Sequence, residues 1–183
     1  MAYQKLQSRE ALDVIQSDTV KIPDPSSVVN VIDGTTAATD GVTKIVVDQT
    51  VANTITATVG TTKFTEMGIQ PGAIVYNVTS SIAAYVTSVD SDTQLTVSVA
   101  TTGTGADVIY IYNRATIGCT LFVGTAGDIE VTMAENNGNV TALNTPGNYS
   151  PLFKGIANGS FLPIQVIQVY ATRTSAADVI ALW

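Results

Sequence analysis

The chain of 183 residues contains no histidine and a single cysteine, Cys119. Histidine is the most common general base and metal ligand in proteins, so its absence removes the usual activator of a serine or cysteine nucleophile. One cysteine excludes an intrachain disulfide and a cysteine-rich metal site. Cys119 lies in the apolar run 118–123, where cysteine usually packs as a small apolar residue. We therefore expect no enzyme, no catalytic residue, no cofactor and no metal.

Charged residues are also scarce, at 13% of the chain against roughly 25% in ordinary soluble domains. They comprise 8 Lys+Arg and 15 Asp+Glu, giving a net charge of −7. Binding to nucleic-acid phosphates or to anionic lipid needs clustered cations, which this chain does not have. No apolar run approaches the ~18–20 residues of a membrane helix, and residues 1–10 lack the apolar stretch of a signal peptide. We expect neither nucleic acid nor a membrane as a partner.

The low charge favours an assembled protein. Hydrophobic residues make up 45% of the chain, and the mean hydropathy is +0.29. A chain of this composition often hides much of its surface against other subunits, so we expect a homo-oligomer, with a trimer as the first guess. The alternative is a lone β-domain whose exposed face carries threonine in place of charge.

The abundant residues, threonine and valine, favour β-strands because their branched Cβ atoms fit a pleated surface. The sequence predicts an all-β fold in which one domain interrupts another. Residues 1–42 and 113–183 are expected to form a discontinuous outer β-sandwich or jelly-roll-like domain that makes the assembly contacts. Residues 43–112 are expected to form a small, projecting β-barrel-like domain, closed or nearly closed, with one helical turn over 64–69. The boundary is placed in a linker of small residues, 35–39, flanked by two Asp-Gly pairs.

Two hairpins are expected in the outer domain. One joins the runs 120–123 and 128–133 across a turn with two glycines, and the other joins 164–172 to 177–183. The second ends on the only tryptophan, whose large apolar side chain predicts a docked strand instead of a frayed tail. The candidate interface residues are Ile180, Leu182, Trp183, Phe161 and Tyr170.

Two weaker patterns leave other functions open. Asp128 and Glu130 are two positions apart on one expected strand, so they share a face as the carboxylate pair of a glycoside hydrolase would, although strand rims commonly carry acids too. Tyrosines of the inserted domain, such as Tyr76, Tyr85 and Tyr110, would bind a glycan if they formed an exposed shelf. Packing in the core or against a subunit is the other use of such residues.

Two sets of segments resemble known proteins. The first set joins both ends of the chain: Tyr3-Gln4-Lys5-Leu6-Gln7, Ser17-Asp18-Thr19-Val20-Lys21-Ile22-Pro23, Gly118-Cys119-Thr120-Leu121-Phe122-Val123-Gly124-Thr125-Ala126-Gly127-Asp128-Ile129, Gly159-Ser160-Phe161-Leu162-Pro163-Ile164-Gln165-Val166 and residues 179–183. This set resembles small structural proteins of tailed phages, including the spike-base proteins on gene-transfer-agent heads. The second set is the segment from Phe64 to Tyr112, with its runs Gly72-Ala73-Ile74-Val75-Tyr76-Asn77 and Val89-Asp90-Ser91-Asp92-Thr93-Gln94-Leu95-Thr96. It is similar to a β-module that recurs in virion proteins of marine phages.

The resemblance implies a virion structural protein, on the capsid as a decoration, cement or head-spike-base subunit. Its partners would be the major capsid protein or other virion proteins, and it would be located in the virion after assembly in the host cytoplasm. An extended N-terminal arm would be able to cross to a neighbouring subunit. The alternative is a tail or spike component whose inserted module binds a host-surface glycan. The motifs are structural, and the loop 135–158 is the part least well matched.

Overall fold

The computed structural model describes residues 8–33, 53–56, 64–100, 108–136 and 150–183. Within these ranges the protein is all-β, with strands, two short 3-10 turns and no α-helix, as the sequence predicts. The chain divides into two compact units. The first unit comprises Met1–Asp18 and Ile117–Trp183, and the second comprises Thr19–Thr116.

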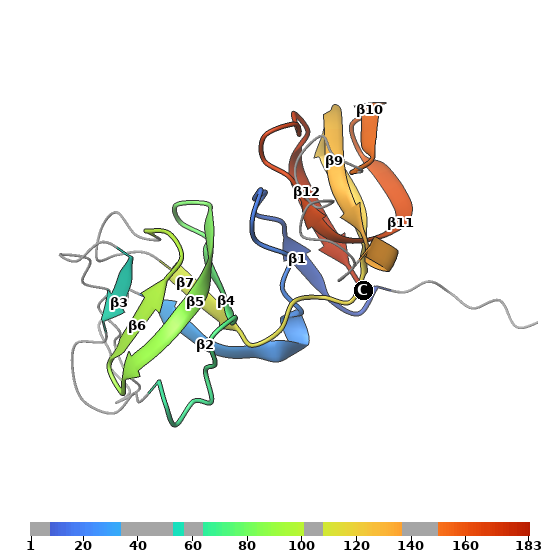
Figure 1. Cartoon of the computed structure of the whole chain (residues 1–183). Coiled ribbons are helices and arrows are strands. Elements are labelled where there is room, and N and C mark those ends of the chain that lie inside the picture. Colours follow the sequence, from blue (N-terminus) through green and yellow to red (C-terminus); the bar gives the residue numbers. More distant parts are fainter. Residues whose placement is uncertain (1–7, 34–52, 57–63, 101–107, 137–149) are drawn as a thin grey trace, which may run out of the picture. The chain divides into compact units, whose positions relative to one another are not determined.

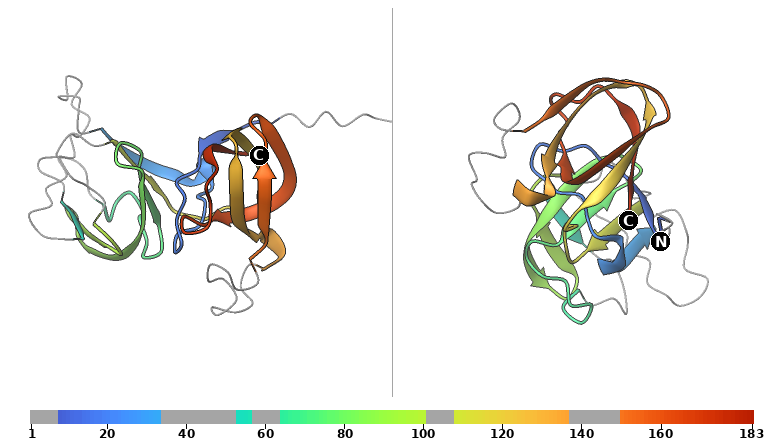
Figure 2. Two further views of the ribbon diagram at one scale, coloured as in Figure 1. Left: turned by 90° about the horizontal axis from the view of Figure 1, so that it is seen from above. Right: turned by 90° about the vertical axis from the view of Figure 1, so that its right-hand side faces the viewer.

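The first unit is built on one antiparallel sheet with the strand order β1-β12-β8-β11-β9-β10. Its strands are β1 (Ala11–Asp13), β8 (Cys119–Thr125), β9 (Gly127–Met133), β10 (Leu152–Ile156), β11 (Ser160–Val169) and β12 (Ala177–Leu182), and a 3-10 turn (Ala134–Asn136) follows β9. Figure 1 shows these strands, and Figure 2 shows the strong curvature of β11. The curvature accompanies a register shift between Leu162 and Val166, because the first part of β11 pairs with β8 and its last part with β9. One bent strand thus connects two halves of the sheet.

Both hairpins expected from the sequence are wrong. β8 and β9 follow each other in the chain but are separated by β11 in the sheet, and β11 and β12 are separated by β8. The start of β9 lies against the segment before β12, since the Asp128 carbonyl accepts hydrogen bonds from the backbone nitrogens of Ser175 and Ala176. Gly127 permits this approach, because a Cβ there would lie 2.4 Å from the Ala176 nitrogen. A turn signal shows where the chain bends but not which strand it pairs with next.

The described part of the N-terminal arm packs on its own unit. Backbone hydrogen bonds join it to the C-terminal strands, among them Arg9 N to Trp183 O at 2.7 Å, Val14 N to Val179 O at 2.8 Å, and Ser17 N to Val169 O at 2.9 Å. The carboxylate of Asp18 ends the arm by accepting hydrogen bonds from the backbone nitrogens of Ala171 and Thr172 and from the Thr172 hydroxyl. Burial raises the pKa of Asp18, but these hydrogen bonds outweigh it and hold the pKa below its usual value. Both parts of the chain are therefore needed to complete this sheet.

The second unit contains an antiparallel sheet with the order β2-β7-β4-β5-β6-β3 (Figure 1). Its strands are β2 (Val28–Asp33), β3 (Thr54–Thr56), β4 (Ile74–Asn77), β5 (Ile82–Ser91), β6 (Gln94–Val97) and β7 (Val108–Tyr112), and a 3-10 turn (Pro25–Ser27) precedes β2. The described strand pairs do not close the sheet into a barrel, since β2 and β3 form its two ends. One face packs on a buried core that includes Phe64, Val75, Leu95 and Ile111. The expected helical turn over 64–69 is a non-helical turn in which Gly68 N donates to Thr65 O at 3.3 Å.

The limits of the second unit differ from the range 43–112 expected from the sequence. β2 lies within residues 1–42, but its hydrogen bonds are with β7. The pairing continues beyond these strands, where Asp24 N donates to Arg114 O at 2.9 Å and Thr116 N donates to Ile22 O at 2.8 Å. The expected boundary at 42/43 itself lies outside the described residues. The composition near 33–41 is a local signal and cannot show that β2 pairs with β7, because these two strands are far apart in the sequence.

This pairing predicts which fragment of the chain folds alone. A fragment of residues 19–116 is expected to unfold cooperatively in urea, because it keeps β2 and the buried side chains of Val20 and Ile22. A fragment of residues 43–112 keeps the pairing of β4 with β7 but loses the whole ladder between β2 and β7, and is expected to show no cooperative transition. Circular dichroism during urea titration measures both. Equal cooperative transitions for the two fragments would contradict the assignment of β2 to this unit.

Candidate functional site: the outer face of the first sheet

One face of the first sheet carries a row of apolar side chains that points away from the core. Residues paired across antiparallel strands project to the same side, and β8 pairs Phe122 with both Phe161 of β11 and Ile180 of β12. Leu182 and Thr120 form the next pair on this side. We call the surface formed by Thr120, Phe122, Phe161, Ile180 and Leu182 the outer face. Phe161 is 49% exposed, and the other four are half-buried.

The opposite side of the same strands is the core of the first unit. Cys119, Leu121 and Val123 alternate with the outer-face residues along β8 and are buried. Val179 and Ala181 do the same along β12. Because side chains alternate between the two faces of a strand, one face of the sheet is buried and the other is apolar and partly exposed. An antiparallel sheet usually turns polar residues to the solvent on its second face, so an apolar second face marks a surface that can bind a partner.

The outer face contains three of the five candidate interface residues. Phe161, Ile180 and Leu182 lie on it, but Trp183 and Tyr170 do not. Strand alternation places Trp183 on the core side, and its backbone is held by hydrogen bonds with Arg9 and Glu10. Tyr170 is fully buried, and its hydroxyl accepts a hydrogen bond of 2.8 Å from the Thr132 hydroxyl. Phe122, the centre of the row, was missed, although its alternation with Leu121 and Val123 was a signal that could have identified it.

Carboxylates lie at the β12 and β1 edge of the outer face. Asp13 of β1 pairs with Ile180, and Asp178 precedes this residue by two positions on β12. The Thr125 hydroxyl donates a hydrogen bond to the Asp178 carboxylate. Gly124 leaves room for Asp178, since a Cβ on the glycine would lie 2.8 Å from the Asp178 Cβ. The apolar row is thus bordered by negative charge on one side.

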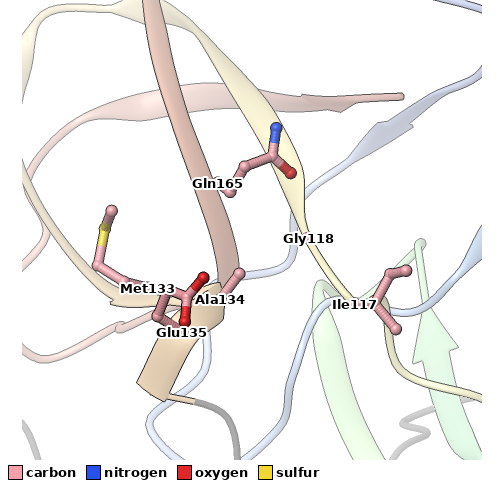
Figure 3. Close-up of a pocket in the computed structure, with 6 residues that line it drawn as sticks. All are labelled: Ile117, Gly118, Met133, Ala134, Glu135 and Gln165. Carbon is pink, nitrogen blue, oxygen red and sulfur yellow. The ribbon is translucent and has the colours of Figure 1, made fainter.

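A pocket of about 290 Å³ opens at the start of β8, beside the bend of β11. Its lining is Ile117, Gly118, Met133, Ala134, Glu135 and Gln165 (Figure 3). The side chain of Gln165 lies over Gly118, because a Cβ there would be 2.7 Å from the Gln165 Oε1 atom. Ile117 is 88% exposed, the highest value for a large apolar side chain among the described residues. The sequence alone does not indicate this pocket, because the register shift that directs Gln165 here has no local signal.

The groups that the sequence offered for catalysis are engaged in structural contacts. Burial raises the pKa of Cys119 to about 12, and its Sγ atom donates to the Val166 carbonyl at 3.3 Å. The Glu130 side chain is fully buried and pairs with Arg173, with Nη1 to Oε1 at 3.2 Å. Asp128 accepts a hydrogen bond of 2.8 Å from Gly155 N. The described residues hold no group of three acidic, cysteine or histidine side chains that could bind a metal ion.

The tyrosines of the second unit are buried or half-buried and make contacts within the unit. Tyr76 is buried and packs edge to face on Tyr112, with ring centroids 6.0 Å apart. Tyr110 stacks on the same ring at 6.3 Å. The Tyr85 hydroxyl accepts a hydrogen bond of 3.0 Å from Lys21 N, and burial raises its pKa. Packing within the unit accounts for these contacts.

Comparison with protein-family models, with curated proteins and with solved structures finds no match to this chain. In the part of the chain that the structure describes, no helix is both long and apolar enough to cross a membrane. A function for this chain is therefore inferred from the geometry of the outer face and its pocket.

Proposed function

We propose that this protein is a phage virion structural protein, a capsid decoration, cement or head-spike-base subunit that attaches through the outer face of its first unit. The single observation that carries the proposal is the row Phe122, Phe161 and Ile180 on the second face of the first sheet. Burial of such a row against another virion protein is favourable by about 25 cal/mol per Å² of apolar surface. The partner would be the major capsid protein or another virion protein, in a homo-oligomeric assembly.

The composition supports the same proposal. The chain has few charges and no histidine, and its candidate nucleophile and carboxylates are buried or hydrogen-bonded. The resemblance of its segments to tailed-phage structural proteins supplies the particle class. The alternative tail or spike role with a glycan-binding module has less support, because Tyr76 is buried and Tyr110 packs on Tyr112.

Locating the protein on intact particles by cryo-electron microscopy tests the proposal. Density for the two β-units is expected on the head. Density only on the tail would overturn the capsid assignment and favour the tail or spike role. Light scattering of the purified protein after size-exclusion chromatography provides a second test, because a monomer that fails to bind emptied capsids would contradict a cement role.

Phe161→Ser tests the outer face directly. Because Phe161 is half exposed, we expect the free energy of unfolding to change by about 1 kcal/mol or less. Binding to particles that lack the protein should weaken by about tenfold or more, since large aromatic side chains dominate interface energies. Cosedimentation with the particles measures binding, and urea titration measures stability.

The matched control is Val99→Ser, which changes an apolar side chain of the second unit that is 42% exposed. It is expected to leave particle binding unchanged. Equal binding by the Phe161→Ser variant and the unmodified protein would show that the outer face is not the attachment surface.

A further inference from the structure

The pocket beside the outer face combines an apolar wall with polar acceptors. Ile117, Met133 and Ala134 supply the wall, and the carboxylate of Glu135 and the amide of Gln165 supply the acceptors (Figure 3). Its volume of about 290 Å³ is just below the ~300–1,000 Å³ typical of ligand pockets. A site of this size suits one long side chain better than a cofactor.

Charge selects the kind of side chain. Glu135 is the charged residue of the pocket lining, and neither it nor Gln165 has a side-chain hydrogen bond or ion pair with the described residues. A purely apolar occupant would cover the wall but would remove water from the carboxylate without replacing its hydrogen bonds. A cation on an aliphatic stem satisfies both parts, because the stem packs on the wall and the charged head meets the carboxylate.

We propose that this pocket binds an arginine side chain of the partner protein. The planar guanidinium group carries five donors in a fork, so it can donate to the Glu135 carboxylate and to the Gln165 Oε1 atom together. Its methylene stem then lies along Ile117 and Ala134. The identity of the partner as a virion protein rests on the proposed function. That partner would present the arginine next to an apolar surface that covers the outer face.

Nuclear magnetic resonance titration of the full chain with Nα-acetyl-arginine amide tests the pocket without the partner. We expect millimolar binding, with shifts concentrated at the backbone amides of Gly118 and Ala134 and at the side-chain amide of Gln165. Nα-acetyl-citrulline amide has nearly the same shape without the charge. It is expected to bind about three- to fivefold more weakly, the value of one exposed ion pair.

Two variants assign the effect to Glu135. Glu135→Gln should weaken arginine binding by the same factor and leave citrulline binding unchanged. Glu10→Gln removes an exposed carboxylate outside the pocket lining and should change neither. Absence of shifts at these three positions, equal affinity for the two ligands, or undiminished arginine binding by the Glu135→Gln variant would each overturn the proposal.

The titration and the particle experiment fail independently. Arginine binding by a protein that is found on no particle would retain the pocket and reject the virion role. Head density together with equal arginine and citrulline affinities would retain the virion role and reject the arginine site.

Discussion

Removal of residues 180–183 is expected to unfold the first unit and leave the second unit folded. These residues supply the pairs Ile180–Phe122, Ala181–Leu121 and Leu182–Thr120 between β12 and β8. They also supply the partners of β1, so the deletion detaches the N-terminal arm as well. The deletion removes the second half of β12, which lies between β1 and β8, so one edge of β8 loses its hydrogen-bonding partner.

Amide nitrogen–hydrogen correlation spectra provide the measurement. Resonances from residues 117–179 should collapse to unfolded positions, whereas those of residues 19–116 should remain dispersed, because the second unit has its own core. Trp183→Ala is the matched control, since it keeps the strand and removes one half-buried side chain; it should stay folded with reduced stability. A native spectrum for the first unit after the four-residue deletion would contradict the role of β12.

Arg173→Ala is expected to destabilise the first unit by about 3 kcal/mol. The side chain of Glu130 is 0% exposed, and its Oε1 atom accepts hydrogen bonds from Arg173 Nη1 and from the Ser150 hydroxyl. Removal of the arginine leaves a buried carboxylate without its cation, which typically costs about 3–5 kcal/mol. We expect the lower end of that range, because Arg173 is itself 41% exposed and water can take part of its place.

Urea unfolding followed by the fluorescence of Trp183 measures this loss, since the only tryptophan belongs to the first unit. Arg114→Ala is the control, because the Arg114–Asp24 pair of the second unit is even closer, at 3.0 Å, but its arginine is 67% exposed. Its unfolding is followed by circular dichroism, because Trp183 lies in the other unit, and its expected cost is about 1 kcal/mol or less. Glu130→Gln combined with Arg173→Ala should recover part of the loss. Equal costs for the two arginine variants would contradict the burial argument.

The inside and outside of individual strands could be predicted because alternation is a local property. The pattern around 118–123 indicated a strand with Cys119 inside, and the structure buries this residue. The C-terminal run was expected to dock, and Trp183 is held by hydrogen bonds at both its nitrogen and its oxygen. Strand preference and side-chain direction depend on neighbouring residues, so a single sequence contains them.

The partners of each strand could not be predicted in the same way. β8 was expected to pair with β9, and β11 with β12, yet β11 lies between β8 and β9. For the same reason, the sequence led to Ile180 and Phe161 as interface candidates but not to Phe122, which lies between them in the sheet. Tyr170 was also proposed as an interface residue. Alternation shows that its side chain lies on the apolar side of a strand, but it does not show whether another segment of the chain covers that side.

By itself, the sequence determined the all-β class, the low charge, the absence of histidine chemistry and the alternation within the strands. Only the tertiary structure decided that β2 belongs to the second unit, that Phe122 lies between Phe161 and Ile180, and that the bend of β11 brings Gln165 over Gly118. The physical reason is that pleating follows from each residue and its neighbours, whereas pairing is chosen by the free energy of the whole sheet among many registers. The outer face and its pocket are products of that choice.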